Sequence, residues 1–134
     1  MLGIDTNVLV RYITDDDAVQ SGIAREAIER AALEGEQLRI CIPVLCELVW
    51  VLGDSSYGYT RDQLADTVEL LLEADALDIE ARDLVRTAAS QFRSGTADFA
   101  DYLLGGLNCS SGCRATLTFD LAAGESDLFE VLRN

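Results

Sequence analysis

The chain has 134 residues, of which 49% are hydrophobic, and this size and composition predict one globular domain over residues 1–134 with a buried core. Its 24 acidic residues against 10 basic ones give a formal net charge of −14, and every basic residue is arginine. The absence of histidine and lysine excludes Ser-His-Asp and Cys-His catalysis, Schiff-base chemistry and the lysine of a phosphate-binding loop. An enzyme of this composition must use carboxylates, hydroxyls and metal ions.

The pattern of apolar residues predicts short strands that alternate with helices. In chain order, the expected elements are a strand at 2–4, a helix at 18–34, a strand at 38–42, helices at 43–52 and from 60 onward, a strand at 76–79, helices at 81–93 and 97–108, and strands at 115–119 and 128–132. Such alternation is typical of an α/β fold with a mainly parallel sheet.

Local signals support several of these boundaries. Asp17 is expected to cap the helix at 18–34, and Gly35 to end it. Pro43 suits the first turn of the next helix, and Thr60 with Gln63 forms a predicted capping box. An apolar stripe on the helix at 18–34 is expected to face the core, and it consists of Val19, Ile23, Ala27, Ile28 and Ala31.

The cysteines and the apolar segments indicate the compartment. The four cysteines lack the spacing and the histidine partners of a zinc site, so we expect four reduced thiols and no disulfide: Cys41, Cys46, Cys109 and Cys113. No apolar run approaches the roughly 18 residues of a membrane span. An acidic residue at position 5 also interrupts the place where a signal peptide would be apolar. We therefore expect a cytoplasmic protein that does not enter the membrane.

Two aspartates follow predicted strands. Asp5 closes the strand at 2–4, and Asp120 closes the strand at 115–119. Ligands of open parallel sheets bind just beyond the carboxyl ends of the strands, so both carboxylates point to the expected site. Either aspartate alone would be explained as a turn or helix cap, and their shared position weakens that explanation.

Glu47 is the only charged residue between Ile40 and Leu52. A helix that is apolar on nearly every side is buried, and an ionised carboxylate inside it needs a partner. We therefore expect Glu47 to be buried. It would either bond to a distant arginine or to backbone amides, or lie in a metal or catalytic pocket.

Asp98 and Asp101 lie three residues apart on one face of the helix at 97–108. Like charges this close favour a bound cation or a raised pKa. Asp98 is also expected to cap the helix, whereas Asp101 lies further into it. Oxygen ligands without histidine select hard cations, so these acids predict Mg²⁺ or Mn²⁺ and a substrate that contains phosphate. The acidic run at 15–17, by contrast, is expected to be a solvated loop that leads to a helix cap.

Four segments resemble motifs of the PIN-domain family. Residues 1–12 resemble its opening strand and DTNxL motif, and among PIN domains they are similar to the VapC-type toxins of bacterial toxin–antitoxin pairs. Residues 42–48 resemble the second motif, a helix with a lone glutamate, and residues 97–104 and 112–120 resemble the third and fourth. The resemblance implies a PIN-like three-layer α/β/α sandwich and metal-dependent hydrolysis of RNA phosphodiester bonds.

The resemblance also implies roles for individual residues. It gives an acidic quartet that performs catalysis and binds Mg²⁺ or Mn²⁺, which consists of Asp5, Glu47, Asp101 and Asp120. Asp5 and Asp101 would be the main ligands. The supporting positions are matched by Asn7, Thr118 and Asp98. Arg11 is expected to line the substrate groove, against the alternative of an ordinary surface charge.

The pair Gly105-Gly106 departs from the family pattern, in which other small residues such as alanine are usual. Each glycine keeps close packing possible but weakens a helix by roughly 1 kcal/mol relative to alanine. The departure concerns stability and not the chemistry of the site.

Family membership would imply partners as well. Toxins of this type form homodimers and are inhibited by a VapB-type antitoxin, often through an arginine placed among the acids. A net charge of −14 suits a basic or amphipathic antitoxin segment. A phosphohydrolase of the haloacid dehalogenase type is disfavoured because it needs a DxD signature and a lysine. The other alternative is a catalytically inactive PIN-fold interaction module, and the complete acidic quartet argues against it.

Overall fold

A computed structural model describes residues 1–133 and contains two compact units, Met1–Ala81 and Arg82–Asn134, called here the N-terminal and C-terminal units. Helices and parallel strands occur in both units. The prediction of an α/β fold with a mainly parallel sheet is therefore confirmed. That a single domain covers residues 1–134 stays a prediction.

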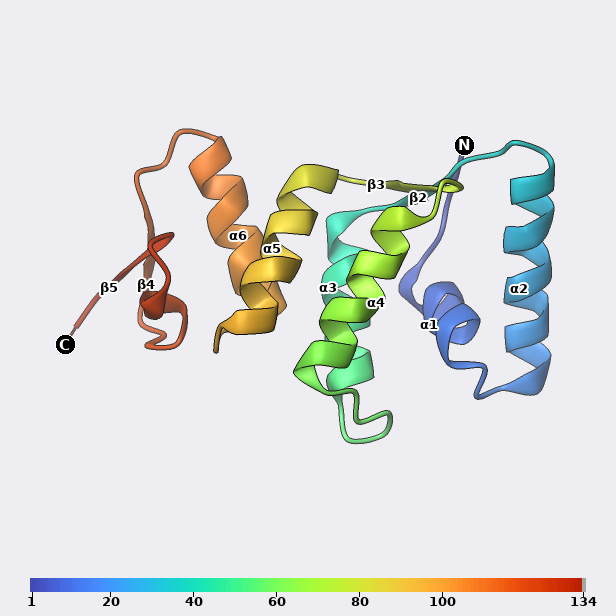
Figure 1. Cartoon of the computed structure of the whole chain (residues 1–134), viewed down its shortest axis with the longest axis horizontal. Coiled ribbons are helices and arrows are strands. Elements are labelled where there is room, and N and C mark those ends of the chain that lie inside the picture. Colours follow the sequence, from blue (N-terminus) through green and yellow to red (C-terminus); the bar gives the residue numbers. More distant parts are fainter. Residues whose placement is uncertain (134) are drawn as a thin grey trace. The chain divides into compact units, whose positions relative to one another are not determined.

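The N-terminal unit holds a three-stranded parallel sheet in the order β1-β2-β3. Its elements are β1 (Leu2–Gly3), α1 (Thr6–Thr14), α2 (Ala18–Leu33), β2 (Leu38–Ile40), α3 (Ile42–Gly53), α4 (Arg61–Glu73) and β3 (Leu77–Ile79). Leu38 of β2 lies opposite Leu2 of β1 on one side and opposite Leu77 of β3 on the other, and these pairs define the register of the sheet. Helix α1 packs against α2 and α3, and α3 packs against α4 (Figure 1).

The predicted helix boundaries of this unit are confirmed by their capping bonds. The Asp17 carboxylate accepts hydrogen bonds from the backbone N–H groups of Val19 and Gln20, and α2 ends just before Gly35, whose φ is +70°. Thr60 and Gln63 form the reciprocal capping box at the start of α4. Each cap satisfies N–H groups that a helix leaves without an internal partner.

Helix α2 buries only part of the predicted stripe, namely Ile28 and Ala31. Its buried residues are Ser21, Ala24, Ile28 and Ala31. Val19 and Ile23 are 71% and 64% exposed, and Ala27 is exposed too, so the predicted stripe is wrong at these three positions. The small residues of the buried face let α2 approach α1 closely, which large apolar side chains would prevent.

The C-terminal unit consists of α5 (Arg82–Ser94), α6 (Phe99–Ser110), β4 (Thr116–Thr118), the 3₁₀ helix η1 (Ala123–Glu125) and β5 (Phe129–Val131). The two helices pack side by side, and the rings of Phe92 and Phe99 meet edge to face at 5.9 Å (Figure 1). Strands β4 and β5 are parallel neighbours, with Thr116 opposite Phe129.

The C-terminal half of α6 is tied to these two strands. Gly105 is buried, and a Cβ atom at this position would lie 2.9 Å from both Leu128 Cβ and Phe129 Cε2. Asn108 donates a hydrogen bond from Nδ2 to Oγ1 of Thr116 at 2.9 Å. Glycine at 105 is therefore required for the close approach of α6 to β5. At Gly106 the nearest atom to a Cβ would be Leu84 Cδ2 at 3.6 Å, an ordinary contact.

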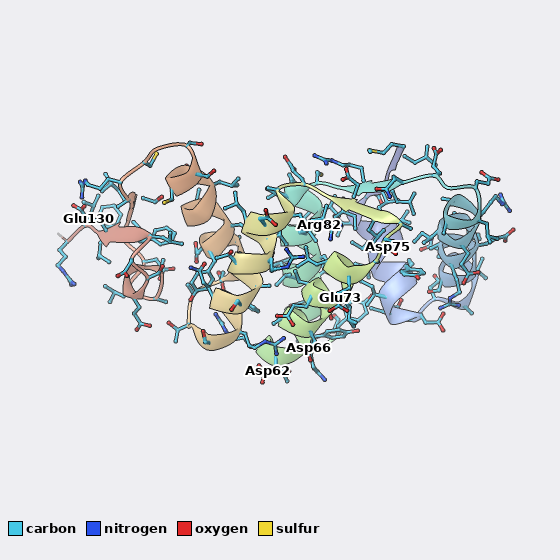
Figure 2. The ribbon with its side chains drawn as sticks, turned by 45° about the horizontal axis from the view of Figure 1, so that its top comes forward. Asp62, Asp66, Glu73, Asp75, Arg82 and Glu130 are labelled. Atoms are coloured by element: carbon cyan, nitrogen blue, oxygen red, sulfur yellow. The ribbon has the colours of Figure 1, made fainter. Side chains whose placement is uncertain are left out.

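Exposed acids account for much of the negative charge. Asp62, Asp66 and Glu73 lie along α4 and Asp75 follows it, as labelled in Figure 2. In the C-terminal unit, Glu130 forms a 3.0 Å ion pair with Arg114.

None of the helices within residues 1–133 is long and apolar enough to cross a membrane.

Candidate active site

The four carboxylates predicted to be catalytic divide equally between the units. Asp5 and Glu47 belong to the N-terminal unit, and Asp101 and Asp120 to the C-terminal unit. Asp5 and Glu47, which are far apart in the sequence, line one pocket of about 480 Å³. The other residues that line this pocket are Thr6, Asn7, Val10, Arg11, Val51 and Tyr57. The structure thus brings together four of the predicted site residues in the N-terminal unit.

Asp5 combines a structural and a potential chemical role. It follows β1 as the N-cap residue of α1, and its Oδ1 accepts a hydrogen bond from the backbone N–H of Val8 at 3.0 Å. Its Oδ2 has no hydrogen-bond partner among residues 1–133. The cap therefore fixes the carboxylate at the pocket and leaves one oxygen available to a ligand.

The prediction that Glu47 is buried is wrong, because its side chain is exposed. Leu45 and Leu48 of α3 are fully buried, whereas Pro43, Glu47 and Trp50 share an exposed face at helical spacing. An apolar composition around the whole helix does not make the whole helix buried, since Trp50 is 75% exposed. No hydrogen bond holds the Glu47 carboxylate within residues 1–133, so both of its oxygens are available at the pocket.

Arg11 also lines this pocket, where it bonds to two other side chains. Its Nη1 bonds Asp16 Oδ1 at 2.9 Å, and its Nε bonds Gln20 Oε1 at 2.8 Å. Asp16 also accepts hydrogen bonds from the hydroxyls of Tyr57, at 2.6 Å, and Thr14, at 2.8 Å. Asp16 is exposed, as expected of a loop that leads to the cap at Asp17, and it also has three side-chain partners that the sequence did not predict.

These hydrogen bonds shift the pKa values of Asp16 and Tyr57. The hydrogen bond from Tyr57, followed by those from Thr14 and Arg11, lowers the pKa of Asp16 from 3.8 to about 2. The same bond to the negatively charged Asp16 raises the pKa of Tyr57. Asp16 is thus a carboxylate and Tyr57 a neutral phenol at any physiological pH.

In the C-terminal unit, Asp98 is the N-cap residue of α6, as predicted. Asp101 is half-buried, and its Oδ2 accepts a hydrogen bond from the backbone N–H of Asp98 at 3.2 Å. Burial raises the pKa of Asp101, and the negative charges of Asp98 and Asp120 raise it further against the opposing effect of that bond. These three acids therefore influence one another, and a nearby cation would relieve the cost of the Asp101 charge.

Asp120 follows β4 and forms a turn with the residues after it. Its Oδ1 accepts hydrogen bonds from the N–H groups of Ala122, at 2.8 Å, and Ala123, at 3.2 Å. Thr118, predicted to support the site, accepts the backbone N–H of Asp120 on its Oγ1 at 3.0 Å. As at Asp5, Oδ2 has no hydrogen-bond partner in the part of the chain that the structure describes.

The side-chain atoms available at these positions can be compared with the ligands that metal ions prefer. Within residues 1–133, no three or more His, Cys, Asp or Glu side chains lie together as a ready group of metal ligands. In the described part of the chain, Asp5, Glu47 and Asp120 nevertheless each keep a carboxylate oxygen without a protein partner. Such oxygens suit Mg²⁺ or Mn²⁺ and not zinc, which prefers nitrogen and sulfur.

The residues that sequence reasoning missed are Tyr57, which lines this pocket, and Asp16, which bonds to both Arg11 and Tyr57. Their side chains bond across 41 positions of sequence. Tyr57 lies in the loop after α3, where the composition gave no sign that it faces the pocket. An aromatic residue in a loop of small and polar residues is a weak signal that could have singled it out.

Comparison with known proteins places this geometry in context. A family model described as PIN domain matches residues 3–122, a range that includes all four predicted catalytic acids. A VapC ribonuclease of Aquifex aeolicus (strain VF5) is 25% identical over 100 residues, which cover 75% of this chain and 73% of that protein.

Proposed function

The chain belongs to the PIN-domain family, and from this premise we propose that it is a metal-dependent endoribonuclease, the toxin of a toxin–antitoxin pair. The observation that carries the proposal is the pocket lined by both Asp5 and Glu47, whose carboxylates keep oxygens without a partner among residues 1–133. The similarity to a VapC ribonuclease supports RNA as the substrate.

We propose that all four acids act in catalysis and that the chain is a single PIN domain. Asp5 and Asp101 would be the main ligands of Mg²⁺ or Mn²⁺, with Glu47 and Asp120 completing the set. When bound, such an ion supplies an activated water and neutralises charge on the phosphodiester. The backbone cap at Asp5 and the turn at Asp120 hold these carboxylates in fixed orientations, which lowers the entropy lost on binding.

The electrostatic environment of Asp101 supports its assignment as a metal ligand. Its half-buried position and the charges of Asp98 and Asp120 disfavour its ionised form. A cation reverses that balance, so Asp101 gains more from a cation than an exposed aspartate would. Asn7 lines the same pocket as Asp5 and can orient a polar ligand there.

The proposal is tested by incubating purified protein with total cellular RNA, in Mg²⁺ or Mn²⁺ and in EDTA. We expect discrete fragments that require the metal and are lost in Asp5→Asn and Asp101→Asn. Asp98→Asn should be milder, because Asp98 is the exposed cap of α6. Asp75→Asn, at an exposed acid outside the pocket, is the matched control and should cleave as wild type.

Two outcomes would contradict parts of this proposal. Full activity in the Asp5→Asn variant would remove the site assignment while leaving the nuclease. Absence of cleavage by folded protein would favour the interaction module without catalysis.

We further propose a basic, amphipathic antitoxin segment as the inhibitor. An apolar pocket of about 410 Å³ lies among α1, α2, α4 and β3 of the N-terminal unit. Ile13, Ile28, Leu70 and Leu71 contribute to its lining, and Leu70 is 67% exposed. Apolar contact there, combined with a net charge of −14, suits a helix with one apolar and one basic face.

The assembly and the compartment complete the proposal. We propose a cytoplasmic homodimer. Light scattering of the purified chain would measure the mass, and a monomer at micromolar concentration would contradict the dimer.

A further inference from the structure

Besides the carboxylates of Asp5 and Glu47, the pocket of about 480 Å³ is lined by cationic, aromatic and aliphatic side chains. Arg11 supplies a positive charge, and Tyr57, Val10 and Val51 supply an aromatic and an aliphatic surface. Two carboxylates repel a phosphate, so a phosphodiester needs a cation in the same pocket. Among the described residues, Arg11 is the only cationic side chain in the pocket lining.

The Arg11 guanidinium is fixed in place, with part of it left free. Asp16 holds Nη1 and Gln20 holds Nε, whereas Nη2 has no protein partner among residues 1–133. Its side chain is 25% exposed, so the free N–H groups remain accessible to a ligand. A guanidinium anchored in this way can donate to a phosphate oxygen with little loss of side-chain entropy.

Tyr57 is held by the same carboxylate. Its hydroxyl donates to Asp16 Oδ2 at 2.6 Å, so the polar end of the side chain is already bonded. What the ring offers to the pocket is its aromatic surface, next to Val10 and Val51. Such a surface suits a nucleobase, because every base has a flat face that stacks on an aromatic ring.

We propose that Arg11 and Tyr57 form a nucleotide subsite beside the catalytic acids, in which Arg11 binds a backbone phosphate and Tyr57 stacks on the adjoining unpaired base. Asp16 is the positioning residue, since it bonds both side chains and does not line the pocket itself. The volume of about 480 Å³ lies within the roughly 300–1,000 Å³ usual for small-ligand sites. This inference rests on the proposed ribonuclease function and assigns binding residues to it.

The experiment measures RNA binding apart from cleavage. A fluorescently labelled, short single-stranded RNA of mixed sequence is titrated with the full chain in EDTA, and anisotropy is followed at several salt concentrations. Arg11→Gln should lower the slope of log affinity against log salt by about 0.7, as expected for one lost phosphate contact on a single strand. Tyr57→Leu should weaken binding by about tenfold and leave that slope unchanged.

Matched controls lie close by in the chain. Arg25→Gln removes the same charge at an arginine that pairs with Asp15 and lies outside the pocket lining. Tyr59→Leu removes a half-buried ring from the same loop as Tyr57, again outside the lining. Both controls should bind RNA as wild type.

A positioning role for Asp16 predicts a specific kinetic result. In cleavage assays with metal present, Asp16→Asn should raise KM several-fold while kcat stays near that of wild type, because ground-state binding is weakened and the acids are untouched. A fall in kcat with unchanged KM would contradict that role.

The outcomes separate this inference from the ribonuclease proposal. If Arg11→Gln and Tyr57→Leu bind RNA as tightly as their controls, or if wild type fails to bind RNA in EDTA, the subsite is wrong. Metal-dependent cleavage that is lost in Asp5→Asn would still support the nuclease in either case. If wild type neither binds nor cleaves RNA, both proposals fail together.

Discussion

Alanine substitutions at Gly105 and Gly106 should have opposite effects, although the two residues are neighbours on α6. Gly106→Ala places its Cβ 3.6 Å from the nearest atom, so the variant gains only the helix preference of alanine, about 0.5–1 kcal/mol. Gly105→Ala would place its Cβ 2.9 Å from Leu128 Cβ and from the Phe129 ring. Neither of these atoms is the free end of a flexible side chain, so α6 and β5 must move apart.

The difference between the two variants isolates the cost of that overlap, because both gain the same helix preference. Overpacking of this kind costs about 1–3 kcal/mol. At about 4 °C per kcal/mol for a chain of this size, the melting temperature of Gly105→Ala should lie about 4–12 °C below that of Gly106→Ala. Thermal unfolding followed by circular dichroism, with urea denaturation as a second measure, gives the comparison directly.

Activity should follow the same order. Helix α6 carries Asp101, and β5 pairs with β4, which leads to Asp120. A shift of about 1 Å between α6 and the strands would displace Asp101 from Asp120, the two acids proposed to act in catalysis, and can cost about a hundredfold in rate. Gly106→Ala should cleave RNA as wild type does. Equal stabilisation by both substitutions would refute the argument that Gly105 is required by its contacts.

Two further predictions concern the N-terminal unit. The folded pKa of Asp16, about 2, lies below its unfolded value of 3.8, so its carboxylate stabilises the fold above about pH 4 and this contribution is lost as the pH falls toward 2. Asp16→Asn should therefore unfold at lower urea than wild type near neutral pH, and urea titrations at decreasing pH should show the gap closing. Leu70→Asp should weaken inhibition of RNA cleavage by the cognate antitoxin, whereas Leu33→Asp, at a residue that is 89% exposed and outside the apolar pocket, should not.

Sequence patterns predicted most elements but missed α1. The segment Thr6–Thr14 is rich in β-branched residues, which favour strands over helices. The structure makes it a helix through tertiary contacts: Asp5 caps it, and Leu9 and Val10 are buried where it packs against α2 and α3. Packing of this kind overrides local preference, and the only local signal of the helix is the capping aspartate that precedes it.

The site residues show the same contrast between features encoded in adjacent sequence and features that depend on tertiary contacts. Asp5 and Asp120 could be located because each follows a strand, a relation that lies in adjacent sequence. Glu47 was correctly placed on a helix and wrongly judged buried, since composition does not reveal which face of α3 the rest of the unit covers. The bonds of Asp16 to Arg11 and Tyr57 depend on a loop brought back from another part of the chain, which no spacing rule encodes.

The choice of substitution at Asp5 decides whether its two roles can be told apart. Its Oδ1 caps α1 through Val8 and its Oδ2 has no hydrogen-bond partner among residues 1–133, so Asp5→Ala removes the cap and the proposed metal ligand together. Loss of a cap costs about 0.5–2 kcal/mol, whereas asparagine caps a helix about as well as aspartate. Asp5→Asn should therefore keep the urea midpoint of wild type and lose cleavage, while Asp5→Ala loses both. If Asp5→Asn were destabilised as much as Asp5→Ala, its loss of activity would report on the fold, and the chemical role of Asp5 would have no support from either variant.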